Sequence, residues 1–220
     1  MISLAGSLPA ERIALAVEAA GLCPLAVDVA ERFSTYFDLL RRWNTKLNLT
    51  AIRDPEDVLQ RHFVECIFCA QSLPAGICTL LDYGSGGGFP GIPIALCRPE
   101  IRVTLSESQG KKVSFLREAA RVLILDAEVY AGRVEDINAG QKFDAVTLRA
   151  VDKMQEAMRN AADRVGEMGW LVLLASSGTV ELPGGLIGRE TAISGSKNRV
   201  LILASRGNVP RETLLDSRNT

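Results

Sequence analysis

Apolar residues change their spacing near residue 76. Before that point they recur at helical intervals, which predicts a helix beginning at Ser7-Leu8-Pro9, a long amphipathic helix over 24–47, and a third capped by Asp54-Pro55-Glu56. After Pro74-Ala75-Gly76, short apolar runs alternate with helical periods. We therefore expect a helical N-terminal subdomain, residues 1–76, followed by an α/β domain, residues 77–220.

Apolar runs in the second part predict strands at 78–83, 101–107, 126–130, 143–148, 169–175, 186–193 and 199–205. Helical periods separate several of these runs, at 90–97, 109–123 and 152–165. This alternation is typical of a Rossmann-like, mostly parallel sheet with helices on both faces and a ligand site beyond the carboxyl ends of its strands. The last two runs follow each other without a helical period, so we expect an antiparallel hairpin at the sheet edge.

A glycine-rich segment, Asp82-Tyr83-Gly84-Ser85-Gly86-Gly87-Gly88-Phe89-Pro90-Gly91, joins the first strand to a helix. Glycines at such a turn let a ligand approach the backbone. Asp82 stands two residues before the first glycine, where it would repel a pyrophosphate and attract a cation, so we favour S-adenosylmethionine (SAM) as the ligand. Residues 86–91 also fit the dinucleotide fingerprint, and a purely structural turn is the third interpretation.

Polar residues stand where the next predicted strands end, and these ends should meet at one edge of the sheet. Glu107-Ser108 ends the second strand, Arg133-Val134-Glu135-Asp136 follows the third, and Arg149 ends the fourth. A carboxylate at Glu107 can accept hydrogen bonds from two ribose hydroxyls. The loop at Val134-Glu135 would border the adenine of the same ligand.

Composition narrows the protein class without naming a function. The chain is 47% hydrophobic and 23% charged, as in ordinary globular proteins, and it contains no apolar stretch long enough to cross a bilayer, so we expect a cytoplasmic protein. Its net charge of −1 gives no general support to nucleic-acid binding, so any basic surface must be local. Five cysteines, an odd number among apolar neighbours, suit reduced, packed thiols.

With its glycine-rich segment and the polar residues at the ends of its predicted strands, the chain closely resembles the RsmG (GidB) family of bacterial 16S rRNA guanine-N7 methyltransferases. The resemblance runs from about Phe37 to Val151 and rests on Trp43-Asn44, Asn48-Leu49-Thr50-Ala51-Ile52, His62, Asp82 to Pro93, Glu107-Ser108, Gly110-Lys111-Lys112, Phe115-Leu116, Gly132-Arg133-Val134-Glu135 and Arg149-Ala150-Val151. The chain differs at Tyr83, where a small aliphatic residue is usual, at Glu65-Cys66, where Asp-Ser is usual, and at Ala175-Ser176-Ser177-Gly178, where Lys-Gly is usual.

The resemblance implies a class I SAM-dependent methyltransferase fold with a helical N-terminal extension, acting on 16S rRNA or a small ribosomal subunit precursor, and we expect a monomer. Together with the residue patterns it predicts these cofactor contacts: Asp82, Gly84, Gly86, Gly88, Phe89, Glu107, Ser108, Val134, Glu135 and Arg149. The RNA contacts that we expect are Arg41, Arg42, Lys111, Lys112 and Arg149. Two alternatives stay open: a methyltransferase of this fold with a small-molecule or protein substrate, and a SAM-binding regulator without catalysis.

Guanine N7 carries an exposed lone pair, so its methylation requires no base to remove a proton. We therefore expect positioning to supply the rate, with no catalytic side chain, covalent intermediate or metal. The fourth strand ends in Thr147-Leu148-Arg149-Ala150 and not in the Asn-Pro-Pro-Tyr pattern of exocyclic-amine methyltransferases. Arg149 would guide phosphate or guanine O6, or pair with an acid such as Glu135. His62 would be a helix-contact residue and not a catalyst.

Overall fold

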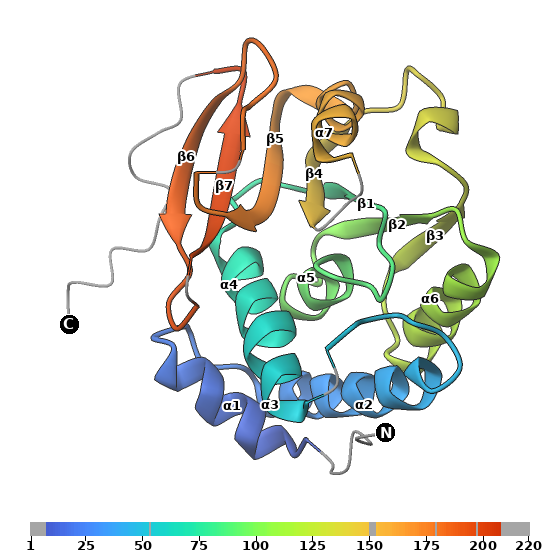
Figure 1. Ribbon diagram of the computed structural model, residues 1–220, viewed down its shortest axis with the longest axis vertical. Helices are drawn as coiled ribbons and strands as arrows, with labels where there is room; N and C mark the ends of the chain where they lie inside the picture. Colours follow the sequence, from blue (N-terminus) through green and yellow to red (C-terminus); the bar gives the residue numbers. More distant parts are fainter. Residues whose placement is uncertain (1–7, 53, 150–152, 179, 197, 208–220) are drawn as a thin grey trace.

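One seven-stranded sheet forms the centre of the protein (Figure 1). This computed structural model describes residues 8–52, 54–149, 153–178, 180–196 and 198–207. The strands are β1 (Thr79–Tyr83), β2 (Arg102–Glu107), β3 (Ala127–Ala131), β4 (Phe143–Arg149), β5 (Val165–Ser176), β6 (Ile187–Ala192) and β7 (Arg199–Ser205). They lie in the order β3-β2-β1-β4-β5-β7-β6, with β7 antiparallel to both of its neighbours and the other pairs parallel. The predicted mostly parallel sheet with an antiparallel edge hairpin is confirmed.

Strand β5 begins earlier than the apolar pattern predicts. It starts at Val165, and its pairing with β4 is irregular between Phe143 and Ala145. A Cβ on Gly169 would lie 2.9 Å from the backbone oxygen of Asp144, so glycine permits this close approach. Two glycines and two exposed side chains interrupt the apolar run here, which is why the sequence pattern did not reveal these residues as strand.

Helices cover both faces of the sheet. On one face lie α5 (Gly91–Cys97) and α6 (Gly110–Val122), and on the other lie α7 (Met154–Ala162) and the short 3-10 helix η2 (Val134–Asp136). Successive strand residues point to opposite faces. Leu80 therefore packs with the α5 and α6 side chains, while Leu81 packs with those of α7.

The N-terminal part is helical, as predicted. Its elements are α1 (Ala10–Ala19), α2 (Val27–Asn44), α3 (Pro55–Val58), the π-helical turn η1 (Leu59–Val64) and α4 (Glu65–Ser72). The predicted cap is confirmed, because the Asp54 carboxylate accepts the backbone N–H groups of Glu56 and Asp57. Helix α2 ends before residue 47 because the buried Asn44 side chain bonds to the following turn, accepting from Leu49 N and Thr50 N.

The N-terminal helices and the sheet share one apolar cluster. Phe33 on α2 and Phe63 in η1 belong to the same buried group as Leu80 on β1 and Ile92 on α5. Figure 1 shows these helices beneath the carboxyl end of the central strands, next to the glycine loop after β1. The helical part is thus placed where it can support a ligand site. Within the described residues, no helix is long and apolar enough to cross a membrane.

Candidate functional site

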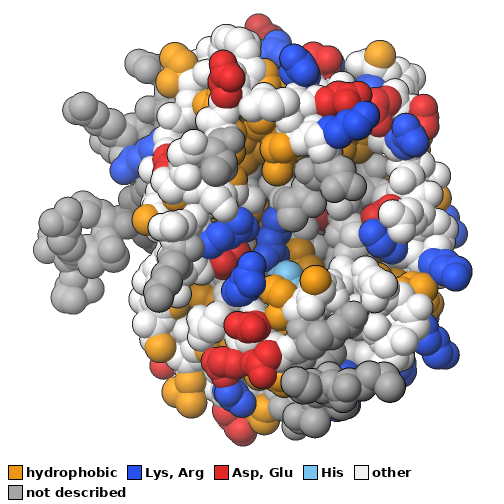
Figure 2. Space-filling view, in the orientation of Figure 1, with side chains coloured by type: hydrophobic (Ala, Val, Ile, Leu, Met, Phe, Trp, Pro, Cys, Tyr) orange, Lys and Arg blue, Asp and Glu red, His pale blue; other side chains and the backbone are white. Residues whose placement is uncertain are grey.

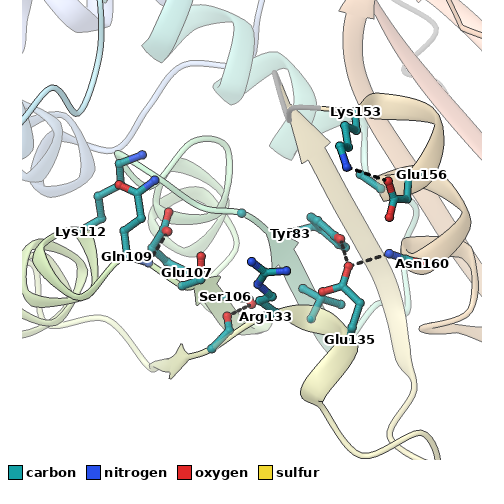
Figure 3. Close-up of a pocket in the computed structure, with 15 residues that line it drawn as sticks. Tyr83, Ser106, Glu107, Gln109, Lys112, Arg133, Glu135, Lys153, Glu156 and Asn160 are labelled. Carbon is teal, nitrogen blue, oxygen red and sulfur yellow. Dashed lines mark hydrogen bonds and ion pairs between the residues drawn. The ribbon is translucent and has the colours of Figure 1, made fainter.

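A pocket of about 440 Å³ opens beyond the carboxyl ends of β1, β2 and β3 and against helix α7 (Figure 3). Its volume lies in the range of small-molecule sites. Its lining consists of Tyr83, Gly84, Ser106, Glu107, Ser108, Gln109, Lys112, Gly132, Arg133, Val134, Glu135, Lys153, Glu156, Ala157 and Asn160. Of the predicted site residues, six line it: Gly84, Glu107, Ser108, Lys112, Val134 and Glu135. The others, Asp82, Gly86, Gly88, Phe89, Arg149, Arg41, Arg42 and Lys111, lie outside this lining.

Glu107 stands at the end of β2 and is held by backbone groups on both oxygens. Oε2 accepts the N–H of Gly86 at 3.0 Å and Oε1 accepts the N–H of Gln109 at 2.8 Å. The residue is 6% exposed and lines the pocket, and a carboxylate has about four acceptor positions, so acceptor capacity remains for a ligand. The backbone oxygen of Glu107 also accepts the N–H of Gly132, which joins the loop after β3 to the same point.

The glycine loop has a backbone shape that other residues rarely adopt. Gly84, Gly86 and Gly88 have φ values of 68°, 55° and 90°. A Cβ on Gly88 would lie 2.4 Å from Cδ1 of Ile92 and 2.8 Å from the hydroxyl oxygen of Tyr36. The loop is therefore pressed against the helices behind it, and its other side is left for a ligand.

Tyr36 on α2 is a support for this loop that the sequence did not reveal. Its hydroxyl donates to the backbone oxygen of Gly87, and its side chain is fully buried. Burial raises the pKa of Tyr36 well above its ordinary value, so the hydroxyl stays protonated and remains a donor. In the sequence it is one aromatic residue on an amphipathic helix, which is indistinguishable from a core residue.

Asp82 differs from expectation, because it faces inward and not into the pocket. It is 1% exposed, its carboxylate accepts from the Thr147 hydroxyl at 2.8 Å, and the N–H of Gly91 lies 3.3 Å away. Burial raises the pKa of Asp82 to about 6, although these hydrogen bonds act to lower it. Asp82 thus ties β1 to β4 and to the start of α5, and it shapes the loop from beneath.

Arg149 pairs with Glu65, so the sequence suggestion of Glu135 as its partner acid was wrong. Arg149 Nη2 lies 3.4 Å from Glu65 Oε2, and Arg199 Nε lies 3.5 Å from the same oxygen. Ser196 donates to the other Glu65 oxygen at 2.9 Å. The Glu65 side chain is 1% exposed and that of Arg149 is 9% exposed. Arg149 therefore joins β4 to α4, two elements far apart in the sequence.

Phe89 links the glycine loop to the N-terminal helices. Its ring stacks on the His62 ring, with centroids 4.4 Å apart and planes at 17°, and His62 Nε2 lies 2.7 Å from the Thr50 hydroxyl oxygen. Burial, and then Arg149 and Arg61 nearby, lower the pKa of His62 to about 3, so its ring is neutral at neutral pH. These contacts agree with the prediction of a helix-contact residue. Figure 2 shows Lys and Arg side chains gathered beside the histidine on this face.

Four of the five basic residues predicted to contact RNA lie on two neighbouring helices, α2 and α6, and the fifth, Arg149, lies on β4. Arg42 on α2 pairs with Glu118 on α6 at 2.6 Å, and Arg41 lies 3.4 Å from Asp38. On α6, the Lys111 side chain is exposed and Lys112 lines the pocket. The structure therefore brings Lys112 to the ligand pocket and places the two arginines on the helical side of the molecule.

All five cysteines are free thiols, and three of them are at least partly buried as predicted. Cys66 and Cys69 are buried on α4, whereas Cys23 and Cys78 are exposed, which corrects the expectation that all five pack as apolar residues. Burial raises the pKa of the Cys66 thiol to about 12, which keeps it protonated. In the described part of the chain, no group of three or more His, Cys, Asp or Glu side chains could hold a metal ion.

Known proteins match this chain in sequence and in fold. A family model described as rRNA small subunit methyltransferase G matches residues 29–181. A ribosomal RNA small subunit methyltransferase G from Roseiflexus is 45% identical over 129 residues, which are 56% of this chain and 55% of that protein. The chain is thus matched to little more than half of this relative's length.

Two solved structures share the fold at low sequence identity. A methyltransferase from Geobacter sulfurreducens has a TM-score of 0.57 at 16% identity, covering 88% of this chain and 96% of that one. An O-methyltransferase from neocarzinostatin biosynthesis, solved in complex with SAM, has a TM-score of 0.53 at 16% identity, covering 79% and 57%. The fold is therefore that of the class I methyltransferases, as predicted.

Proposed function

Because this chain belongs to the rRNA small subunit methyltransferase G family, we propose that it transfers a methyl group from SAM to N7 of a guanine in 16S rRNA. The observation that carries this proposal is the family match over the segment that builds the pocket, from the helices that support the glycine loop to β5. We propose as substrate the 16S rRNA, either free or in a small ribosomal subunit precursor.

The residues of the pocket fit SAM. Glu107 offers acceptors for the ribose hydroxyls, and Val134 offers an apolar contact for the adenine. Gly84 has no side chain, so the cofactor can approach its backbone closely. Bound SAM supplies an electrophilic methyl group on a sulfonium. Gly86 and Gly88 support the loop, and Asp82 fixes it from beneath, so we propose that these three act on the cofactor through the shape of the loop.

The chain's own contribution to transfer would be orientation. The lone pair of guanine N7 needs no deprotonation, so the residues must hold the base and the donor in line and exclude water. Phe89, stacked on a neutral His62 and with the Arg149 guanidinium 5.7 Å from its ring centroid, forms a rigid surface next to the glycine loop. We propose that the guanine approaches over this surface, that Arg41, Arg42, Lys111 and Lys112 meet RNA phosphates, and that Arg149, which is paired with Glu65 and 9% exposed, acts by holding this surface in place.

We further propose that the protein acts as a monomer in the cytoplasm, where its rRNA substrate is made. The guanine must be presented outside a stacked helix for its N7 to reach the methyl group, which favours a loop of the rRNA.

Incubation with labelled SAM and small-subunit rRNA tests this function. We expect label in the RNA and, after borohydride and aniline treatment, strand cleavage at a single guanine, because that chemistry cleaves at N7-methylated guanine. RNA binding should weaken as salt rises, because phosphate contacts release counterions. Transfer to a protein or small molecule with none to RNA would show the alternative substrate class, and SAM binding without transfer to any of these would show a regulator.

A further inference from the structure

Three side chains from three separate elements meet on one wall of the pocket (Figure 3). The Tyr83 hydroxyl, at the end of β1, donates to Oε1 of Glu135 in η2 at 2.5 Å. Asn160 Nδ2 on α7 donates to the same oxygen at 2.6 Å. Two donors converging on one carboxylate oxygen hold the Glu135 side chain in one orientation, because hydrogen bonds to a charged acceptor are strong and directional.

The same contacts fix the charges of the group at neutral pH. Burial acts to raise the pKa of Glu135, but hydrogen bonds from Tyr83 and Asn160 leave it below its ordinary value. Burial and the bond to Glu135 raise the pKa of Tyr83 to about 12. Glu135 is therefore an ionised acceptor and Tyr83 a neutral donor.

The backbone beneath Glu135 is held as firmly as its side chain. Arg164 is 8% exposed and donates to the backbone oxygens of Glu135, at 3.2 Å, and of Asn138, at 2.8 Å. The 3-10 helix η2 is therefore fixed from one side by Arg164 and from the pocket side by Tyr83 and Asn160. Glu135 is exposed to the pocket, and these contacts restrict the rotation of its carboxylate, which favours one ligand geometry over others.

The surroundings of this carboxylate suit one edge of a purine. Val134 and Ala157 are apolar residues of the pocket lining and belong to the cluster on which Tyr83 packs, and Glu135 adds a negative acceptor. Adenine carries an exocyclic amino group that donates hydrogen bonds, whereas hypoxanthine carries an oxygen at that position that would be repelled. The proposed ribose acceptor, Glu107, belongs to the same pocket.

We propose that Tyr83 and Asn160 are positioning residues that hold the Glu135 carboxylate as the acceptor for the exocyclic amino group of the bound adenine. Tyr83 then contributes to the choice of an aminopurine over an oxopurine, although it does not itself meet that group. This inference rests on the proposed function, because it takes SAM as the occupant of the pocket. It also gives a role to Tyr83, a residue at which the chain departs from the usual small aliphatic side chain.

Calorimetry with two stable thioethers, S-adenosylhomocysteine and S-inosylhomocysteine, tests the proposal. We expect the wild type to prefer the adenosyl compound by about 100-fold. Tyr83→Phe keeps the ring and removes the hydroxyl, so adenosyl affinity should fall about tenfold while inosyl affinity stays unchanged. In methyl transfer, the loss should appear mainly as a higher KM for SAM and not as a lower kcat, because the adenine lies away from the reacting atoms.

Two further variants make the test decisive. Asn160→Ala removes the other donor to Glu135 and should likewise reduce the preference for the adenosyl over the inosyl compound. Tyr130→Phe is a matched change on β3 outside the pocket lining, and it should leave the affinities for both compounds unchanged. An unchanged preference in Tyr83→Phe and Asn160→Ala, or an equal loss of both ligands at an unchanged melting temperature, would overturn the proposal while the proposed function stands. A wild type that binds neither thioether would overturn both.

Discussion

Replacing Glu107 by alanine is expected to weaken SAM binding about 100- to 1000-fold. Two effects add. The ribose would lose its proposed carboxylate acceptor, and the N–H groups of Gly86 and Gln109 would lose the oxygens that they contact at 3.0 and 2.8 Å. The glycine loop then keeps the bond from the Ser85 N–H to the backbone oxygen of Ser106, but it and the start of α6 lose their bonds to the Glu107 side chain. Isothermal titration of SAM into the variant measures the loss directly.

Glu128→Ala is the matched control for that change. Glu128 lies on the neighbouring strand β3, pairs with Thr104 in the sheet register, and has an exposed side chain. Its replacement should leave SAM affinity within about twofold of the wild type, because exposed charges away from a site contribute little. Equal affinities for Glu107→Ala and wild type would show that the ligand does not use this pocket.

Replacing Glu65 by glutamine is expected to lower the free energy of unfolding by about 3 kcal/mol. The substitution keeps the shape and the contact with Ser196 but removes the negative charge that Arg149 and Arg199 share. Two guanidinium groups would then face each other across a neutral amide, and Arg149 is too buried for water to compensate fully. Urea unfolding followed by circular dichroism measures the change.

The exposed ion pair between Arg98 and Glu100 provides the comparison. The Glu100 side chain is 56% exposed, so Glu100→Gln should change the unfolding free energy by less than about 0.5 kcal/mol. If Glu65→Gln is no more destabilising than Glu100→Gln, the shared carboxylate does not hold α4, β4 and β7 together.

The sequence predicted the parts of the site that depend on local pattern. The strand and helix alternation placed Gly84, Glu107 and Val134 at one edge of the sheet, and the structure brings all three to one pocket. Local spacing was enough because each residue stands at the carboxyl end of a strand in a parallel sheet. Such ends lie at the same edge of the sheet, so the residues that follow them come close together.

The remaining parts depend on pairs far apart in the sequence. The hydroxyl of Tyr36 reaches Gly87, and Arg149 reaches Glu65 and not Glu135. Asp82 was expected to face a cationic ligand, but Thr147 and Gly91 draw its carboxylate inward. The spacing within one element carries no information about which side chain on another element will complete a hydrogen bond, so these contacts required the three-dimensional arrangement.

We expect the turn after β1 and the pocket beside it to bind a sulfonium donor and not a dinucleotide. Titration of the wild-type protein, in parallel, with SAM, S-adenosylhomocysteine and NADH tests it most directly. We predict saturable heat from the first two compounds, with one site per chain, and none from NADH. Tight binding of NADH with no heat from SAM or S-adenosylhomocysteine would contradict it.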